Sequence, residues 1–259
     1  MAKWIQYTLC FEEETFRGQD IVEMIQAGIG FSPKRIYAYN AFRLDKAYEA
    51  KDLETLAWEG YGVDVSLWGS SDTKMQDNLN YFKIQERGKE SEQKAQILTW
   101  ILPSETHTES SVIKQLLAHP CLRTAYCCDE EDRWFQNANT PSKYQMRGRN
   151  YVNAQIYFDD QWFMEMIDIS HNPGRSTFVN GYELSSCWRM WFGPSFYELV
   201  SQDRLLAFPQ ARRVEQTDTG HVFIELYADP FEADLPENRE VQQAFRDWVG
   251  MEELITPHD

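Results

Sequence analysis

The chain has 259 residues, of which 42% are hydrophobic and 14% aromatic, and its formal charge is −16 at pH 7. Disordered acidic segments lack the aromatic and aliphatic residues that close a core, so this composition excludes an acidic tail and predicts a folded body. The negative field of such a body repels nucleic acid and anionic membranes and favours basic protein partners.

The first 136 residues predict a mixture of strands and helices. Residues 4–11 alternate in polarity and predict a strand. Asp20 is expected to cap a helix whose apolar face carries Ile21, Ile25 and Ile29. Ser110 is expected to cap another helix, which Pro120 ends. A helix is also expected over 52–58, and strands over 35–42, 63–68, 79–86, 95–102 and 122–128.

Residues 137–150 are polar, contain Pro141 and Gly148, and have no apolar periodicity. We therefore expect this segment to be a linker or loop between an N-terminal α+β subdomain, 1–136, and a C-terminal α+β subdomain, 151–259. The two subdomains could also form one compact domain.

The second half predicts two hairpins and two helical stretches. One hairpin joins 151–158 to 162–169 across the turn pair Asp159 and Asp160, and the other joins 212–216 to 221–227. A helical stretch is expected from Ser185 or Ser186, with a break at Gly193 and Pro194 and an end near Leu206. The last helix is expected from Pro236.

Strands and helices do not alternate regularly along this chain. Regular alternation is typical of a doubly wound parallel sheet, so the pattern favours the α+β class. We expect one or more largely antiparallel or mixed sheets with helices packed on them.

The five cysteines are odd in number and irregularly spaced, which predicts reduced thiols rather than a disulfide framework. The apolar stretch 4–11 is short and soon followed by acids, so it does not predict a signal peptide. No run approaches the ~18 to 20 apolar residues of a membrane span. We expect a cytoplasmic protein with no membrane partner.

No motif in the chain predicts catalysis, a cofactor or a metal site. A Gly-x-Ser-x-Gly elbow is missing, Gly28 and Gly30 follow a helix instead of opening one, and the histidines are scattered. An enzyme of unrecognised family, such as a hydrolase using dispersed carboxylates, remains an alternative. It predicts a pocket in which titratable groups converge with shifted pKa values.

The acidic surplus is concentrated near the C-terminus, because residues 218–259 contain 11 acids and only two bases, Arg239 and Arg246. At interfaces, acids mainly accelerate encounter and select partners, while aromatic rings supply much of the affinity. The expected partner-binding residues are acids in three clusters and two tryptophans: Asp129, Glu130, Glu131, Asp132, Asp159, Asp160, Trp188, Trp191, Asp229, Glu232, Asp234 and Glu237.

The strand-like opening 4–11, the stretch Val65-Ser66-Leu67-Trp68-Gly69 and the block 188–196, with Trp191-Phe192-Gly193-Pro194 at its centre, suggest a family. In these segments the chain resembles the immunity proteins of bacterial polymorphic toxin and type VI secretion systems. The resemblance implies a non-catalytic cytoplasmic α+β protein that binds a cognate toxin and occludes its active site.

Toxins of such systems that act on nucleic acid are commonly basic, so the resemblance and the acidic charge together predict a basic toxin, first of all a nuclease, as the partner. Nucleic acid itself is not an expected partner. A third hypothesis is a scaffold or adaptor subunit of a larger bacterial assembly.

Overall fold

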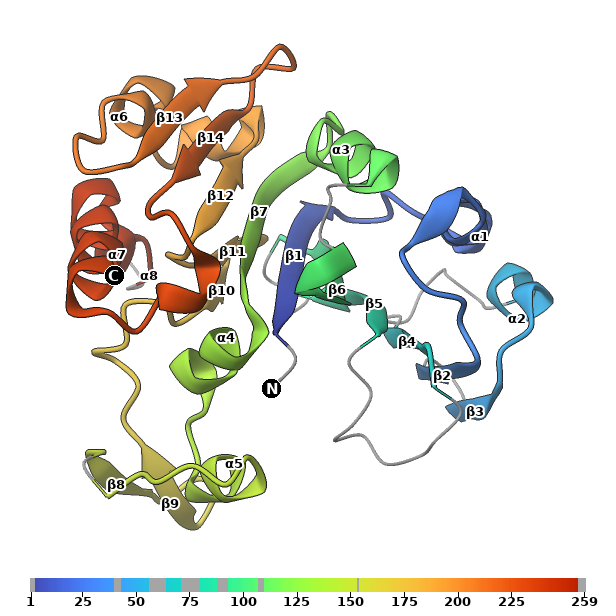
Figure 1. Ribbon diagram of the computed structural model, residues 1–259, viewed down its shortest axis with the longest axis horizontal. Helices are drawn as coiled ribbons and strands as arrows, with labels where there is room; N and C mark the ends of the chain where they lie inside the picture. Colours follow the sequence, from blue (N-terminus) through green and yellow to red (C-terminus); the bar gives the residue numbers. More distant parts are fainter. Residues whose placement is uncertain are drawn as a thin grey trace.

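The computed structural model describes residues 3–39, 43–55, 64–70, 80–87, 93–106, 110–152 and 154–255. Within these ranges a ten-stranded antiparallel sheet crosses the molecule in the order β13-β14-β12-β7-β1-β6-β5-β4-β2-β3 (Figure 1). Its strands are β1 Trp4–Glu12, β2 Arg35–Tyr39, β3 Arg43–Ala47, β4 Asp64–Trp68, β5 Tyr81–Arg87, β6 Ala95–Pro103, β7 Leu122–Asp129, β12 Arg189–Phe192, β13 Arg213–Gln216 and β14 Val222–Glu225.

Two short hairpins and several helices complete the described part. The hairpin strands are β8 Ile156–Asp159 with β9 Met164–Ile167, and β10 Thr177–Val179 with β11 Tyr182–Leu184. The helices are α1 Gly18–Gly28, α2 Ala50–Thr55, α3 Ser111–Leu117, α4 Glu130–Asn137, α5 Pro141–Met146, α6 Gln202–Leu206, α7 Pro236–Val249 and α8 Met251–Ile255, with 3-10 turns η2 Ser104–Thr106, η3 Pro194–Glu198 and η4 Pro230–Glu232. The α+β prediction, with an antiparallel sheet, is confirmed.

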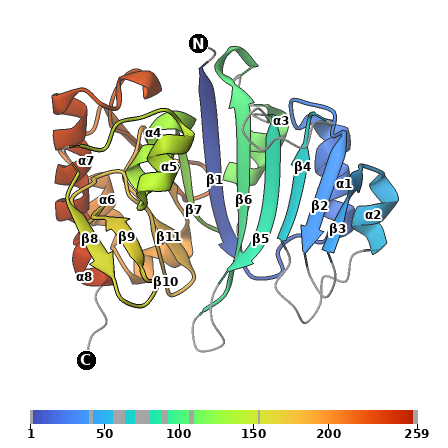
Figure 2. The same cartoon turned by 90° about the horizontal axis from the view of Figure 1, so that it is seen from below.

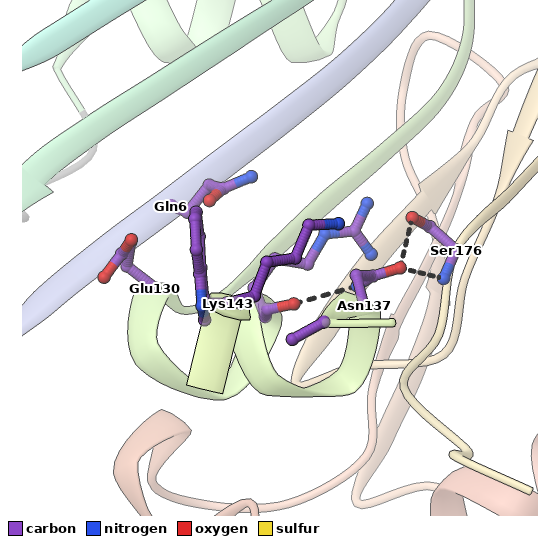
Figure 3. Close-up of a pocket in the computed structure, with 8 residues that line it drawn as sticks. Gln6, Glu130, Asn137, Lys143 and Ser176 are labelled. Atoms are coloured by element: carbon purple, nitrogen blue, oxygen red, sulfur yellow. Dashed lines mark hydrogen bonds between the residues drawn. The ribbon is translucent and has the colours of Figure 1, made fainter. Parts of the chain in front are cut away.

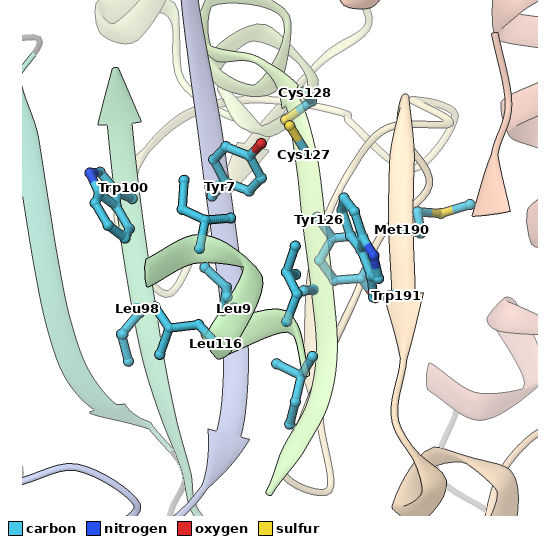
Figure 4. Close-up of a cluster of buried hydrophobic side chains, with 14 of the residues drawn as sticks. Tyr7, Leu9, Leu98, Trp100, Leu116, Tyr126, Cys127, Cys128, Met190 and Trp191 are labelled. Atoms are coloured by element: carbon cyan, nitrogen blue, oxygen red, sulfur yellow. The ribbon is translucent and has the colours of Figure 1, made fainter. Parts of the chain in front are cut away.

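Strand β1 lies in the middle of the sheet, between β6 and β7. Tyr7 and Leu9 alternate with polar residues, and both are fully buried on the face that α3 covers, where Leu116 lies over Leu9 and Leu98 (Figure 4). Figure 2 shows α1 and α3 on one side of this part of the sheet.

The C-terminal half supplies strands β12, β13 and β14 of the sheet, and its β11 and α7 pack on the other face at β7 and β12. The Tyr126 hydroxyl on β7 donates a 2.7 Å hydrogen bond to the carbonyl of Glu183 on β11. Further along, the ring of Phe192 on β12 lies 5.8 Å from that of Phe245 on α7, centroid to centroid. Because β12 pairs directly with β7, strands from both sides of residues 137–150 share one sheet.

The segment 137–150, predicted as a linker or loop without periodicity, contains helix α5. Thr140 precedes this helix and Pro141 occupies its first turn, where a missing N–H costs nothing. A helix of six residues, fewer than two turns, is too short to produce a recognisable apolar period, so the sequence pattern did not reveal it.

The helical stretch predicted from Ser185 or Ser186 to the break at Gly193 is wrong. The Ser185 and Ser186 hydroxyls instead donate to the carbonyls of Gly174 and Gln242, and residues 189–192 form β12 between β7 and β14. Aromatic residues favour a strand that is covered on both faces, and such a strand has no alternation to distinguish it from a buried helix.

Most other predicted elements are confirmed, with shifted ends. The Ser110 side chain caps α3 by accepting the N–H of Ile113. Asp20 is not the cap of α1 but lies in its first turn, where its carboxylate accepts the N–H of Arg17 at 2.7 Å. Predictions that extended over 40–42, 56–58, 63 and 79 lie outside the described residues. No helix of the described part is long and apolar enough to cross a bilayer.

Candidate protein-binding site

Two acidic segments that lie about a hundred residues apart in the sequence meet in one cleft of about 360 Å³, here called the acidic cleft. The first is the start of α4, and the second follows η4. Residues from the loop after α5 and from α7 close the cleft. It is lined by Asp129, Glu131, Asp132, Phe135, Tyr144, Arg149, Asn150, Phe231, Ala233, Asp234 and Arg239.

The acidic run at 129–132 has a structural role as the start of α4. The Asp129 side chain accepts the N–H of Glu131 at 3.2 Å as the helix N-cap, and the three acids that follow occupy the first turn. Negative side chains are favourable there because the helix dipole is positive at its N-terminus. The acidic run is therefore a helix start, which the sequence pattern did not predict.

Two of the cleft acids are neutralised from within the chain and two are not. Asp132 pairs with Arg239, and Glu131 with Arg149. Among the described residues, neither Asp129 nor Asp234 has an ion-pair partner. Burial, together with the neighbouring carboxylates of Asp132 and Glu131, raises the pKa of Asp129 to about 7. The cleft thus has a net attraction for cations.

Aromatic rings form one wall of the acidic cleft. The Phe135 and Tyr144 ring centroids lie 5.3 Å apart, and the Arg149 guanidinium lies 4.6 Å over the Phe135 ring. Ring faces attract cations, and a partly desolvated site strengthens that attraction. Carboxylates and ring faces together are suited to a lysine or arginine side chain.

A second, polar pocket of about 260 Å³ is lined by Glu130 and Asn137 of α4, together with Gln6, Lys143 and Ser176 (Figure 3). Its acid, Glu130, is held by Arg147 at 2.7 Å, and the Asn137 side-chain oxygen accepts from the backbone N–H and the hydroxyl of Ser176. Burial lowers the pKa of Lys143, whose ammonium donates to the Asn139 side chain. Glu130 is therefore a structural ion-pair residue and not a free contact for a partner.

The strands β8 and β9 form a hairpin, residues 156–167, that projects with α5 from one end of the molecule (Figure 1). In the described part, eight of the ten exposed large hydrophobic side chains lie between residues 146 and 164. The most exposed rings are those of Phe158 (58%), Trp162 (68%) and Phe163 (81%). A gathering of exposed rings on one small element is typical of an interaction site.

The remaining predicted site residues are divided between surface and core. Asp159 and Asp160 lie at the hairpin turn, and Asp229 caps η4 by accepting the N–H of Phe231. Glu232 is exposed at the end of η4, and Glu237 is exposed in the first turn of α7. The two tryptophans expected as anchors, Trp188 and Trp191, are buried, with exposed fractions of 5% and 6%. Trp191 lies on β12 and packs against the ring of Phe223 on β14, and Trp188 directly precedes β12, where the Arg189 guanidinium lies over its ring.

The chain matches no known family model, curated protein or solved structure. Within the described residues, no three His, Cys, Asp or Glu side chains are grouped as metal ligands. The acidic cleft and the hairpin are therefore the features on which a function can be argued.

Sequence reasoning missed the exposed rings, although a signal for them exists. From Ile156 to Met164 the apolar residues do not alternate with polar ones, and Trp162 and Phe163 stand beside a turn. Strands that are apolar on both faces are normally covered on both faces by other elements. A short hairpin at the surface is not covered in this way, so its rings are left exposed.

Proposed function

We propose that this chain is an acidic, immunity-type binding protein that neutralises a basic protein toxin, specifically a nuclease, by covering its active site. The observation that supports this best is the acidic cleft. It combines two carboxylates without ion-pair partners, Asp129 and Asp234, with a wall of aromatic rings. These groups are complementary to a protruding lysine or arginine side chain.

The net negative charge of the whole chain also favours a basic partner. A nuclease must attract phosphates, so the surface around its active site is rich in lysine and arginine. An acidic protein is negatively charged, as nucleic acid is, so the same basic surface attracts it. This long-range attraction accelerates the encounter. The resemblance to immunity proteins supplies the expectation of inhibition, in addition to binding.

Growth rescue tests the proposal. The protein encoded next to this chain's gene is expressed alone and together with the chain, and its nuclease activity on plasmid DNA is titrated with the purified chain. We expect growth arrest without the chain, growth with it, and complete inhibition at an equimolar ratio. Growth arrest that the chain leaves unchanged would contradict inhibition, and a complex without inhibition would favour the scaffold hypothesis.

A matched pair of charge reversals connects the rescue to the acidic cleft. Asp234→Lys changes the cleft, whereas Glu240→Lys makes the same change of charge at an exposed acid on α7, outside the cleft. We expect Asp234→Lys to weaken rescue and Glu240→Lys to leave it intact. Equal effects of the two variants would show that net charge alone, and not the cleft, matters.

One observation favours a second candidate, a hydrolase. A carboxyl group with a pKa of about 7, such as that of Asp129, suits a general acid, and the carboxylates of Asp132 and Asp234 line the same cleft. Turnover of p-nitrophenyl esters, phosphates or glycosides that Asp129→Asn abolishes would support this candidate. Turnover by wild type and variant alike would exclude Asp129 as its acid.

A further inference from the structure

The hairpin 156–167 has an anchored base and an exposed tip. At the base, Met166 and Ile167 are buried, and the Ile167 N–H donates a 2.8 Å hydrogen bond to the carbonyl of Asn139. From Ile156 to Met164, by contrast, every large apolar side chain is exposed. Because the base is held firmly, these side chains are presented in a fixed position.

The turn at the tip is also held in one conformation. The Asp159 carboxylate accepts the backbone N–H groups of Gln161 and Trp162 at 2.8 and 3.0 Å. Phe163 follows with a positive φ of 51°, which is uncommon for an aromatic residue. A turn that is ordered before binding loses little conformational entropy when a partner covers it.

The exposed area is large for so small an element. The six apolar side chains between Ile156 and Met164 together leave on the order of 600 Å² exposed, given that an aromatic side chain can bury roughly 150 to 250 Å². Specific complexes bury about 800 Å² on each partner. A partner groove that encloses both faces of the hairpin would therefore cover most of the area that one side of a standard interface buries.

Charge decides which occupant fits the hairpin. Residues 156–168 contain four acids, Asp159, Asp160, Glu165 and Asp168, and no Lys, Arg or His. In a symmetric dimer these acids would face the same acids of the second copy and be repelled. An anionic bilayer would repel them as well. A protein surface with an apolar groove and cationic edges matches both the rings and the acids.

We propose that the hairpin 156–167 is the apolar anchor of this protein and inserts Trp162 and Phe163 into a groove, flanked by lysine or arginine residues, on a partner protein. The inference rests on the proposed function, because it identifies how the same partner is held. It adds that affinity comes mainly from the hairpin, whereas the acidic cleft accelerates the encounter. Tyr144 lines the cleft, and its helix α5 packs beside β9, so one partner can reach both features.

Site-specific photo-crosslinking in the source cell provides the first test. A benzoylphenylalanine residue replaces Phe163 in the full chain, and a control chain carries it in place of Tyr39, a 57% exposed ring on β2. We expect position 163, and not position 39, to crosslink one protein of basic sequence, identified by mass spectrometry. Crosslinks to a second copy of the chain, or equal crosslinking from both positions, would overturn the proposal.

Binding of that purified partner provides the second test. The double variant Trp162→Ala with Phe163→Asn removes both rings, and Asn tolerates the positive φ at position 163. We expect the double variant to weaken affinity at least about 30-fold, mainly through faster dissociation, and Tyr39→Ala to have no effect. Unfolding of the double variant in urea should match wild type, since the lost rings are exposed.

The outcomes separate this inference from the proposed function. If the chain inhibits its basic partner but the double variant binds as tightly as wild type, the hairpin is not the anchor and the proposed function stands. If no basic partner is found and the chain instead forms a dimer in sedimentation, or binds phosphatidylserine vesicles, through Trp162 and Phe163, both proposals are wrong.

Discussion

Asp129 combines a structural role with an electrostatic cost. Its carboxylate caps α4, yet burial and two neighbouring acids raise its pKa to about 7 from an ordinary 3.8. A raised pKa means that the folded state binds the proton more tightly than the unfolded state does. Ionised Asp129 therefore destabilises the fold increasingly as the pH rises from about 4 to 7, and fully above 7.

Replacing Asp129 by Asn keeps the N-cap acceptor and removes the charge. We expect Asp129→Asn to raise the free energy of unfolding by about 1–2 kcal/mol at pH 8, after discounting for solvent screening, and to have little effect at pH 4.5. Urea unfolding at both pH values measures this difference. The exposed Asp160→Asn serves as the control, and a gain at pH 4.5 as large as that at pH 8 would contradict the assignment.

Glu183 on β11 forms a buried ion pair with Arg133 on α4. Its carboxylate, whose side chain is 5% exposed, accepts from Arg133 at 2.8 Å and from Arg87 at 3.2 Å. Glu183→Gln leaves the buried Arg133 without its counter-charge and should cost about 3 kcal/mol of unfolding free energy. Adding Arg133→Met should restore at least about 1 kcal/mol of it.

Urea unfolding of the two variants and of the exposed control Glu240→Gln measures this coupling. Additive losses in the double variant would show that the pair contributes nothing beyond its separate members.

At the scale of elements, prediction from sequence succeeded where one local signal determines the structure. The alternation of residues 4–11 specified β1, and Ser110 specified the start of α3. Prediction failed at residues 189–192, because a central strand that is buried on both faces has no alternation to read. It also failed at α4, where an acidic run was interpreted as a binding surface when it is first a helix start.

Gly193 marks the end of β12, where the chain passes very close to β7. A Cβ at this position would lie 1.8 Å from the carbonyl oxygen of Leu122, and the Gly193 N–H donates to the carbonyl of Arg123. Gly193→Ala forces the two segments apart and should cost about 3 kcal/mol or more. Gly148→Asn is the control, since Gly148 has φ of 64° and open space around it.

Urea unfolding distinguishes the two glycine variants. A loss under about 1 kcal/mol for Gly193→Ala would mean that β12 and β7 can separate without disturbing the sheet.

At the scale of the whole molecule, composition predicted the folded acidic body, and the clusters 129–132 and 229–237 proved to be neighbours in space at Asp129 and Asp234. The sequence could not predict that Asp129 and Asp234 line the same cleft, because this depends on how α4 and η4 pack. Trp188 and Trp191 were predicted as anchors because aromatic residues are frequent in that part of the sequence. A segment rich in aromatic residues is more often part of the core. The exposed rings lie on a hairpin that the sequence analysis had selected only for its acids.

The central claim is that a negative surface, focused at the acidic cleft, captures a cationic protein. The most direct test is the association rate constant with the purified partner, measured from roughly 20 to 400 mM NaCl, a range over which screening shortens the reach of exposed charges several-fold. The proposal predicts a fall of at least about tenfold, with a lower rate and a weaker salt dependence for Asp234→Lys. A rate constant that is the same at every salt concentration, in wild type and variant alike, would contradict it.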